Sequence, residues 1–375
     1  MVEFGAFGDA EQATKWFSRQ DNETIDYIKV RAALRDFVTV YGADDAQTEL
    51  LALVVLRALV VSAAAASADT AGRKPFIAPA AKAHGAACRI SDELRRNPGV
   101  SNAADSAKYT VYSCAGEQRP APKDAADAIY RSTNLSGGVA AIALDADKPG
   151  AWSPLWHSAG MSADLNDLWR KLKNQLGSGL ANWSFWIEWY EAILNGTPLP
   201  WELTHRIALQ VTDEEWNAGQ ATVALRIDAI RTKLLLEKEI EQLKKQLSQA
   251  TKQATAHRKH NNPPPLDDDH KVGAETITLI WADLEALEAE IANPNAEPSA
   301  LQKIAQRLWA IAKKITRYCG GKIDTTLEAA AKELGSTGTR WVVGSGAVYW
   351  LSTQEGTQSV AKLAWQYAEK LLAGG

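Results

Sequence analysis

Histidines and aspartates gather between residues 257 and 270, and this mixture of side chains can bind a metal ion. His257 and His260 come before a run of three prolines, while Asp267, Asp268, Asp269 and His270 follow it. Consecutive prolines favour an extended polyproline conformation, which separates the first histidines from the aspartates. Since no cysteine joins the group, we predict a linker or a short recognition segment here and expect no metal ion and no cofactor.

Acid–base chemistry would need a histidine or carboxylate near a binding surface, and His205 with Glu188 and Glu191 is the nearest arrangement to this in the sequence. The chain has 45 acidic residues, so a pair of carboxylates is not by itself informative. His205 follows Leu-Thr in a helical segment, as a partly buried structural histidine would. Phosphate-binding, zinc-protease and serine-hydrolase motifs are absent from the sequence. We therefore predict no catalytic residue and a protein that is not an enzyme.

Composition limits the class of protein. With 375 residues, 46% of them hydrophobic and 23% charged, the chain can form two or three domains with cores of their own. The net charge of -4 gives no electrostatic reason to expect a nucleic-acid partner. The first residues lack the basic and apolar regions of a signal peptide, so we expect a cytoplasmic protein.

No segment shows the sustained alternation of a β-strand, so the predicted fold class is all-α. Residues 1–150 are rich in alanine and predict a multi-helix N-terminal bundle, because alanine has the highest helix propensity. The longest apolar run is Leu50–Ala66, which is shorter than a membrane span and contains Arg57. It favours a buried helix of a bundle over a membrane helix.

Residues 151–226 form a predicted Trp-rich helical module. Asn195-Gly196 should end one helix, and Thr212 with Glu215 has the pattern of a capping box that starts another. The aromatic rings could stack on bases or sugars, but their helical spacing and the few interleaved cations favour a packed core. Eight of the fourteen tryptophans lie in this segment: Trp152, Trp156, Trp169, Trp183, Trp186, Trp189, Trp201 and Trp216.

We predict one long coiled-coil-like helix at residues 227–258, followed by a Pro-rich linker at residues 259–270. Leu236, Ile240, Leu243 and Leu247 alternate spacings of four and three residues, which is the seam of a coiled coil. About three heptads are marginal for an isolated dimer. The seam therefore packs on the chain's own body or pairs in an oligomer, and the sequence leaves both open.

Residues 271–375 predict a smaller C-terminal module of four or five helices. Asp324 should cap one of them, and a Gly-rich hairpin at 341–351 should precede the last. Trp341 and Trp350 flank this hairpin, as aromatic residues do in segments that enter a membrane interface. A membrane surface is thus a candidate partner of residues 336–375, although Gly344 and Gly346 equally suit close helix packing.

Two segments resemble a family of uncharacterised bacterial proteins, especially proteobacterial ones. Trp186-Ile-Glu-Trp-Tyr-Glu-Ala-Ile-Leu-Asn-Gly196, followed by Trp216-Asn-Ala-Gly219, resembles their recurring Trp-rich region. His260-Asn261-Asn262-Pro263-Pro264 resembles their Gly-His-Asn-Asn-Pro-Pro linker, with Lys259 in place of the glycine. The resemblance implies a bacterial origin and a modular helical build, with no established activity attached.

Two functions remain as hypotheses. The first is a non-enzymatic helical scaffold or interaction protein that oligomerises or captures a protein partner. The alternative is a membrane-acting effector of a bacterial conflict or defence system, peripheral to the membrane and active through its C-terminal module. Candidate interaction residues are those of the seam, the linker and the hairpin: Leu236, Ile240, Leu243, Leu247, His260, Asn261, Asn262, Pro263, Pro264, Trp341 and Trp350.

Overall fold

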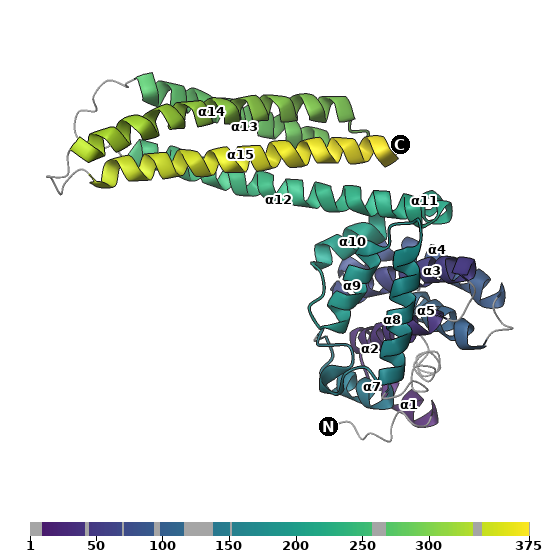
Figure 1. The fold of residues 1–375 in the computed structure, drawn as a ribbon. Coiled ribbons are helices and arrows are strands. Elements are labelled where there is room, and N and C mark those ends of the chain that lie inside the picture. Colours follow the sequence, from purple (N-terminus) through teal and green to yellow (C-terminus); the bar gives the residue numbers. More distant parts are fainter. Residues whose placement is uncertain are drawn as a thin grey trace. The chain divides into compact units, whose positions relative to one another are not determined.

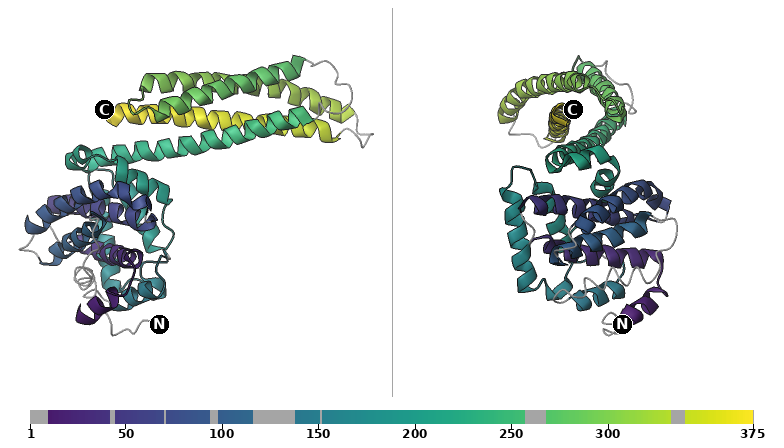
Figure 2. Two further views of the ribbon diagram at one scale, coloured as in Figure 1. Left: turned by 180° about the vertical axis from the view of Figure 1, so that it is seen from behind. Right: turned by 90° about the vertical axis from the view of Figure 1, so that its right-hand side faces the viewer.

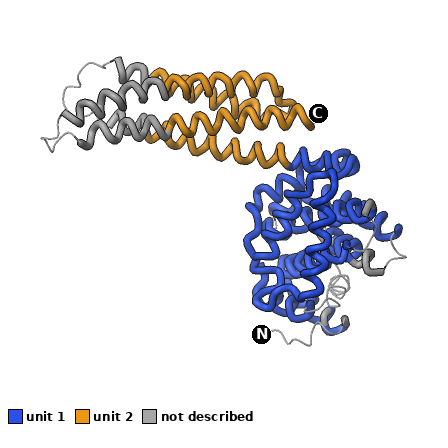
Figure 3. Tube along the Cα trace, viewed as in Figure 1, with its two compact units in different colours: residues 1–227 blue, residues 228–375 orange. Residues whose placement is uncertain are grey.

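The protein is helical in every part that the structure describes, so the predicted all-α fold class is confirmed (Figure 1). The computed structural model describes residues 10–41, 45–69, 71–93, 98–115, 138–150, 152–256, 268–332 and 340–374. The chain divides into two compact units, residues 1–227 and residues 228–375 (Figure 3). The finer division into five parts stays a prediction.

Unit 1 contains both the Ala-rich and the Trp-rich segments. Its Ala-rich helices are α1 (Ala10–Phe17), α2 (Asn22–Asp36), η2 (Phe37–Val40), α3 (Asp45–Ser67), η3 (Ala71–Phe76), α4 (Ile77–Glu93), α5 (Pro98–Ala115) and α7 (Gly138–Asp147). Its Trp-rich helices are η4 (His157–Ala159), α8 (Ala163–Ser178), α9 (Ser184–Leu194), α10 (Trp201–Gln210) and α11 (Asp213–Ala218).

Two helices form the centre of unit 1. In α2 every residue from Thr24 to Asp36 is buried, including its charged ones. The apolar run identified in the sequence forms α3, and 78% of its window Gln47–Ser67 is buried. Among the described residues α3 is the one helix long and apolar enough to cross a membrane. Arg57 is accommodated because it pairs with Asp213 at the start of α11 and lies 5.5 Å from the ring centre of Trp216.

The aromatic residues of the Trp-rich segment pack into this same unit. Trp183, Trp186 and Trp189 are each no more than 2% exposed, as expected for core side chains and not for a stacking surface. The Tyr190 hydroxyl donates a hydrogen bond of 3.0 Å to the Leu34 carbonyl oxygen of α2. This bond satisfies the one polar atom of a ring that is otherwise surrounded by apolar groups.

The helix ends of the Trp-rich segment follow the sequence signals. Thr212 and Glu215 form the predicted capping box of α11, in which each side chain accepts from the other's backbone N–H. Helix α9 ends at Leu194, and Gly196 has a φ of 72°. An added Cβ at Gly196 would lie 2.4 Å from the backbone nitrogen of Pro154, so this turn requires glycine both for its φ and for space.

Unit 2 is built from long antiparallel helices. They are α12 (Gln220–Ala256), whose first turns belong to unit 1, α13 (Asp268–Ala292), α14 (Pro298–Lys332) and α15 (Arg340–Gly374). Viewed along the helices, α12, α13 and α14 follow an arc with α15 on its inner side (Figure 2, right). Lys370 of α15 pairs with Asp228 of α12 at 3.1 Å, and Gly356 lies against Leu243, so these two helices run in opposite directions.

The coiled-coil seam of α12 lies in the core of unit 2. Leu236, Ile240, Leu243 and Leu247 are 0–1% exposed. They share one apolar cluster with residues of the other three helices, so the seam packs on the chain's own body, one of the two alternatives that the sequence left open. The partners from α13, α14 and α15 include Ile280, Leu284, Leu287, Leu301, Ile304, Leu308, Val360, Ala364 and Ala368.

The C-terminal module differs from the sequence expectation in its helix count. After residue 267 the described chain forms three long helices, not four or five. Asp324 lies inside α14 and not at a helix start. The predicted hairpin at 341–351 is wrong, since α15 runs without a break from Arg340 to Gly374. Gly344 and Gly346 lower the helix propensity without removing a backbone N–H, and no proline follows them.

Replacing Gly196 with alanine should destabilise unit 1 by about 2 kcal/mol or more, from a strained positive φ and from the clash with Pro154. Gly150 provides the control, because its φ is 82° but an added Cβ would meet nothing within 4 Å. Gly150→Ala should therefore cost only about 1 kcal/mol, the conformational part. Urea denaturation measures both, and equal losses would contradict the assigned close contact.

Candidate functional site

The strongest cluster of chemically active side chains lies inside unit 1, around Asp145 of α7. Arg31 and Arg35 lie one turn apart on α2, and both point at this carboxylate. Arg31 Nε donates to Asp145 Oδ1 and Arg35 Nη2 donates to Oδ2, each at 2.6 Å. All three side chains are fully buried. Two guanidinium groups thus enclose one carboxylate in the interior.

The same two arginines hold the segment that follows α7. Arg31 donates to the carbonyl oxygens of Ser153 and Pro154, each at 2.9 Å. Arg35 Nη2 donates to the Leu155 carbonyl oxygen at 2.6 Å. The planar fork of an arginine suits several fixed acceptors at once, so the cluster ties α2, α7 and residues 153–155 together.

His157 completes the cluster and gives it the outline of a catalytic relay. Its Nε2 lies 2.8 Å from Asp145 Oδ1, and its Nδ1 lies 3.5 Å from the Ser153 hydroxyl oxygen. His157 has a φ of 51°, a positive value that no other non-glycine residue of the described chain adopts. A serine, a histidine and a carboxylate in contact are the elements of nucleophilic catalysis.

The environment of Asp145 favours a structural role for this relay. The carboxylate charge is already balanced by two arginines, and the Ser153–His157 distance is at the limit of a hydrogen bond. His157 is 15% exposed and lies next to the loop that the arginines hold. We therefore interpret these residues as a buried ionic clamp, named here the Asp145 clamp.

Burial and charge act in opposite directions on the groups of the Asp145 clamp. Burial alone would raise the pKa of Asp145, but Arg35, the hydrogen bond from His157 and Arg31 outweigh it and hold the pKa below its usual value. Burial lowers the pKa of the Arg35 guanidinium against the attraction of Asp145. Burial also raises the pKa of the adjacent Tyr27 to about 12.

The acid–base residues considered from the sequence have separate partners. His205 Nε2 lies 2.8 Å from the Ser67 hydroxyl oxygen, and its ring contacts Phe76 edge-on. Burial lowers the pKa of this histidine. Glu191 pairs with Lys173 of α8 at 2.8 Å, and Glu188 is exposed. His205 bonds to Ser67 and Glu191 pairs with Lys173, so these contacts do not assemble an acid–base site.

The predicted interaction residues are placed in three ways. Leu236, Ile240, Leu243 and Leu247 are core residues of unit 2. Trp341 and Trp350 belong to α15, in a stretch whose side chains lie outside the described residues. His260, Asn261, Asn262, Pro263 and Pro264 also lie outside the described residues, as do His257 and Asp267. Elsewhere in the described chain no cluster of metal-binding side chains is found.

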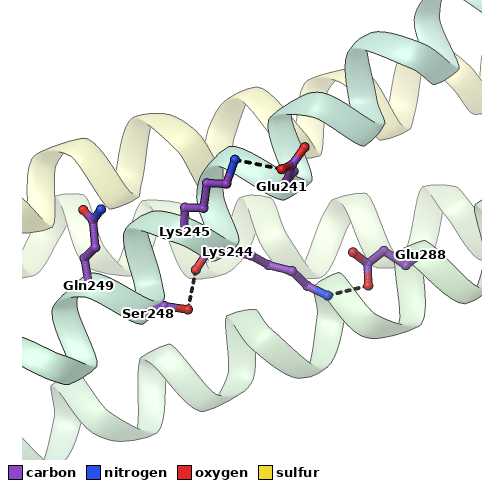
Figure 4. A pocket seen from close by; sticks show the side chains of 6 residues that line it. All are labelled: Glu241, Lys244, Lys245, Ser248, Gln249 and Glu288. Atoms are coloured by element: carbon purple, nitrogen blue, oxygen red, sulfur yellow. Dashed lines mark hydrogen bonds and ion pairs between the residues drawn. The ribbon is translucent and has the colours of Figure 1, made fainter.

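A shallow polar groove of about 350 Å³ lies on unit 2, between α12 and α13 (Figure 4). Lys244 pairs across it with Glu288, and Lys245 pairs along α12 with Glu241 at 2.7 Å. The Ser248 hydroxyl donates to the Lys244 carbonyl oxygen. Each charge in the groove therefore has a partner within the chain, and a ligand would have to replace these exposed pairs.

No family model, curated protein or solved structure matches this chain. The bacterial origin implied by the resemblance of its two segments therefore stays a prediction.

The sequence analysis missed the Asp145 clamp. The available signal was a pair of arginines one turn apart in Arg31-Ala-Ala-Leu-Arg35, and an aspartate in the otherwise apolar Val139-Ala-Ala-Ile-Ala-Leu-Asp145. Charges in such apolar helices must be paired when buried. Sequence alone does not show that these helices, more than 100 residues apart, are neighbours.

Replacing Asp145 with asparagine should cost about 3–5 kcal/mol of unfolding free energy, because two buried guanidinium groups lose their counter-charge. The folded-state pKa of Asp145 is lowered. Its stabilisation is therefore full above the unfolded pKa of about 4 and is lost as the pH falls through the folded value. Urea denaturation at neutral and acidic pH measures both effects.

Asp167→Asn provides the control, because Asp167 pairs with Arg170 and Lys171 on the surface of α8. It should leave the unfolding free energy nearly unchanged. A comparably small loss for Asp145→Asn would show that the Asp145 clamp does not stabilise unit 1.

Proposed function

We propose that this protein is a non-enzymatic helical interaction protein that associates with itself or with a protein partner. The observation that carries the proposal is the outer surface of unit 2. Large apolar side chains are exposed there, although the unit has a complete core of its own: Leu235 is 48% exposed, Leu279 55% and Leu372 61%. These three residues belong to α12, α13 and α15.

The use of charged groups inside the chain also supports this proposal. In unit 1 the charged side chains of the Asp145 clamp pair with one another and donate to the backbone, although Arg35 Nη1 is buried without a partner. In unit 2 the lysines of the polar groove pair with glutamates. Catalytic sites usually combine a concave pocket with titratable groups left available to a substrate. These two clusters instead use their charged groups for internal pairing.

Burial of the α12 seam decides how the proposal can be tested. Leu236, Ile240, Leu243 and Leu247 hold unit 2 together, so their removal would unfold it and abolish any association indirectly. Exposed residues are the appropriate targets, because replacing them leaves the core intact. Among the described residues of unit 2, Leu279 and Leu372 are the most exposed large apolar side chains.

Light scattering of the full-length protein should give a concentration-dependent mass above that of the 40.7 kDa chain. Leu279→Ser with Leu372→Ser should shift the mass toward the monomer, since each replacement removes apolar contact area from an interface. Circular dichroism should show unchanged helicity. Leu180→Ser is the control, because Leu180 is fully exposed in a turn of unit 1 and should not affect the mass.

A wild-type protein that stays monomeric at every concentration would contradict self-association. Partner capture would then be tested with the same variants, by recovering a single defined protein that binds wild type and the Leu180→Ser control but not the double variant. Failure to recover such a protein as well would overturn the proposed function.

The alternative, a membrane-acting effector, also remains a proposal. It requires release of vesicle contents in addition to contact with lipid. Full-length protein added to dye-loaded vesicles should then release the dye, and vesicles that stay intact would argue against this activity.

A further inference from the structure

The outer face of α14 has an unusual distribution of charge. Between residues 298 and 315 the sequence contains Lys303, Arg307, Lys313 and Lys314 and no carboxylate. The apolar face of the same stretch is occupied, because Leu301, Ile304, Ala305, Leu308, Ala312 and Ile315 are buried in the core of unit 2. The cations therefore lie on the opposite, exposed face.

Three of these cations have no counter-charge within reach in the described chain. Arg307 pairs with Asp283 of α13 at 2.7 Å. Lys303, Lys313 and Lys314 are exposed and form no ion pair with a described residue. Helix α13 carries the acidic residues of this region, but only Asp283 pairs with α14 among the ion pairs of the described residues. A net positive surface thus remains on α14.

An exposed tryptophan lies within this positive surface. Trp309 is 40% exposed and belongs to the same face as Lys313, one turn further along α14. The exposed side of α14 thus combines an amphipathic ring with cationic side chains, of which Lys313 is the nearest along the helix. Tryptophan is enriched at the headgroup level of membranes, and clustered lysines are attracted to anionic lipids.

We propose that this face of α14, formed by Lys303, Trp309, Lys313 and Lys314, is a docking surface for the anionic headgroups of a membrane. The lysines approach the phosphates, and Trp309 enters the interface between headgroups and acyl chains. The apolar face of α14 stays in the core, so contact is shallow and the bundle remains folded. This inference uses a different surface from the proposed self-association and does not depend on it.

The small extent of the positive surface favours anionic lipid over nucleic acid as the occupant. The positive surface lies on one helix of a chain whose net charge is -4, whereas nucleic-acid binders usually show a wider basic excess. Stacking on single-stranded bases usually involves several aromatic rings along a groove. Trp309 is the one exposed aromatic residue of the described face of α14.

Co-sedimentation of the full-length protein with vesicles tests the proposal. Binding should be clear with vesicles rich in phosphatidylglycerol, weak with phosphatidylcholine alone, and lost as salt approaches about 1 M. The triple variant Lys303→Glu, Lys313→Glu, Lys314→Glu should bind at least about tenfold more weakly, since each cation near an anionic surface contributes about fivefold. Trp309→Ser should weaken binding roughly threefold through lost interfacial contact.

Control variants show whether binding depends on the position of the lysines on α14 or only on the net charge of the protein. Lys238→Glu, Lys245→Glu, Lys362→Glu changes the net charge equally at exposed lysines of α12 and α15, and it should bind like wild type. Trp365→Ser is the control for Trp309→Ser, because Trp365 is 37% exposed and bonds to Glu369 on α15. If the charge-reversed variant misfolds by circular dichroism, the glutamine triple variant replaces it.

Three outcomes would overturn the proposal. One is equal binding to neutral and anionic vesicles, and another is equal loss in the test and control triple variants. The third is binding of a single-stranded oligonucleotide or an acidic polypeptide without any binding of vesicles. Selective loss in the α14 variants would support it.

Discussion

The fold of unit 1 depends on the burial of one carboxylate. Asp145 loses its hydration in the interior, and that loss is tolerable only if opposite charges and hydrogen bonds replace the water. Arg31 and Arg35 provide both, and they also donate to the carbonyl oxygens of residues 153–155. The constraint therefore couples α2, α7 and the start of the Trp-rich segment. Neither helix can move away without leaving a buried charge unpaired, and displacement of residues 153–155 would leave arginine donors without acceptors.

Several aromatic residues of unit 1 pack next to the Asp145 clamp. Phe37 follows α2 directly and contacts both Trp169 and Tyr190, with ring centres 6.4 Å and 5.0 Å apart. Arg35 lies 5.6 Å from the ring centre of Trp156. Arg35 thus takes part both in the Asp145 clamp and in a contact with an aromatic ring. Six of the eight tryptophans of the Trp-rich segment are buried in the core of unit 1, whereas Trp152 and Trp201 are half-buried and have ring centres 4.5 Å apart.

Unit 2 is held together differently, because apolar side chains of four long helices form its core and most of its charges stay outside. Its surface therefore offers features that the interior of unit 1 lacks. Exposed leucines on α12, α13 and α15 suit contact with protein, and the lysines and tryptophan of α14 suit contact with anionic lipid. The two proposed interactions use separate surfaces, so one can fail while the other holds.

The sequence by itself determined the helical class, the capping box at Thr212, the helix stop at Gly196 and the apolar seam of α12, because these depend on residues close together in the chain. It also indicated that the tryptophans are core residues, through their helical spacing. Only the tertiary structure decided that the seam packs within the chain and that Asp145 meets Arg31 and Arg35. Both sets of contacts join different helices, and those of Asp145 join residues more than 100 positions apart. Local periodicity carries no information about which helices become neighbours.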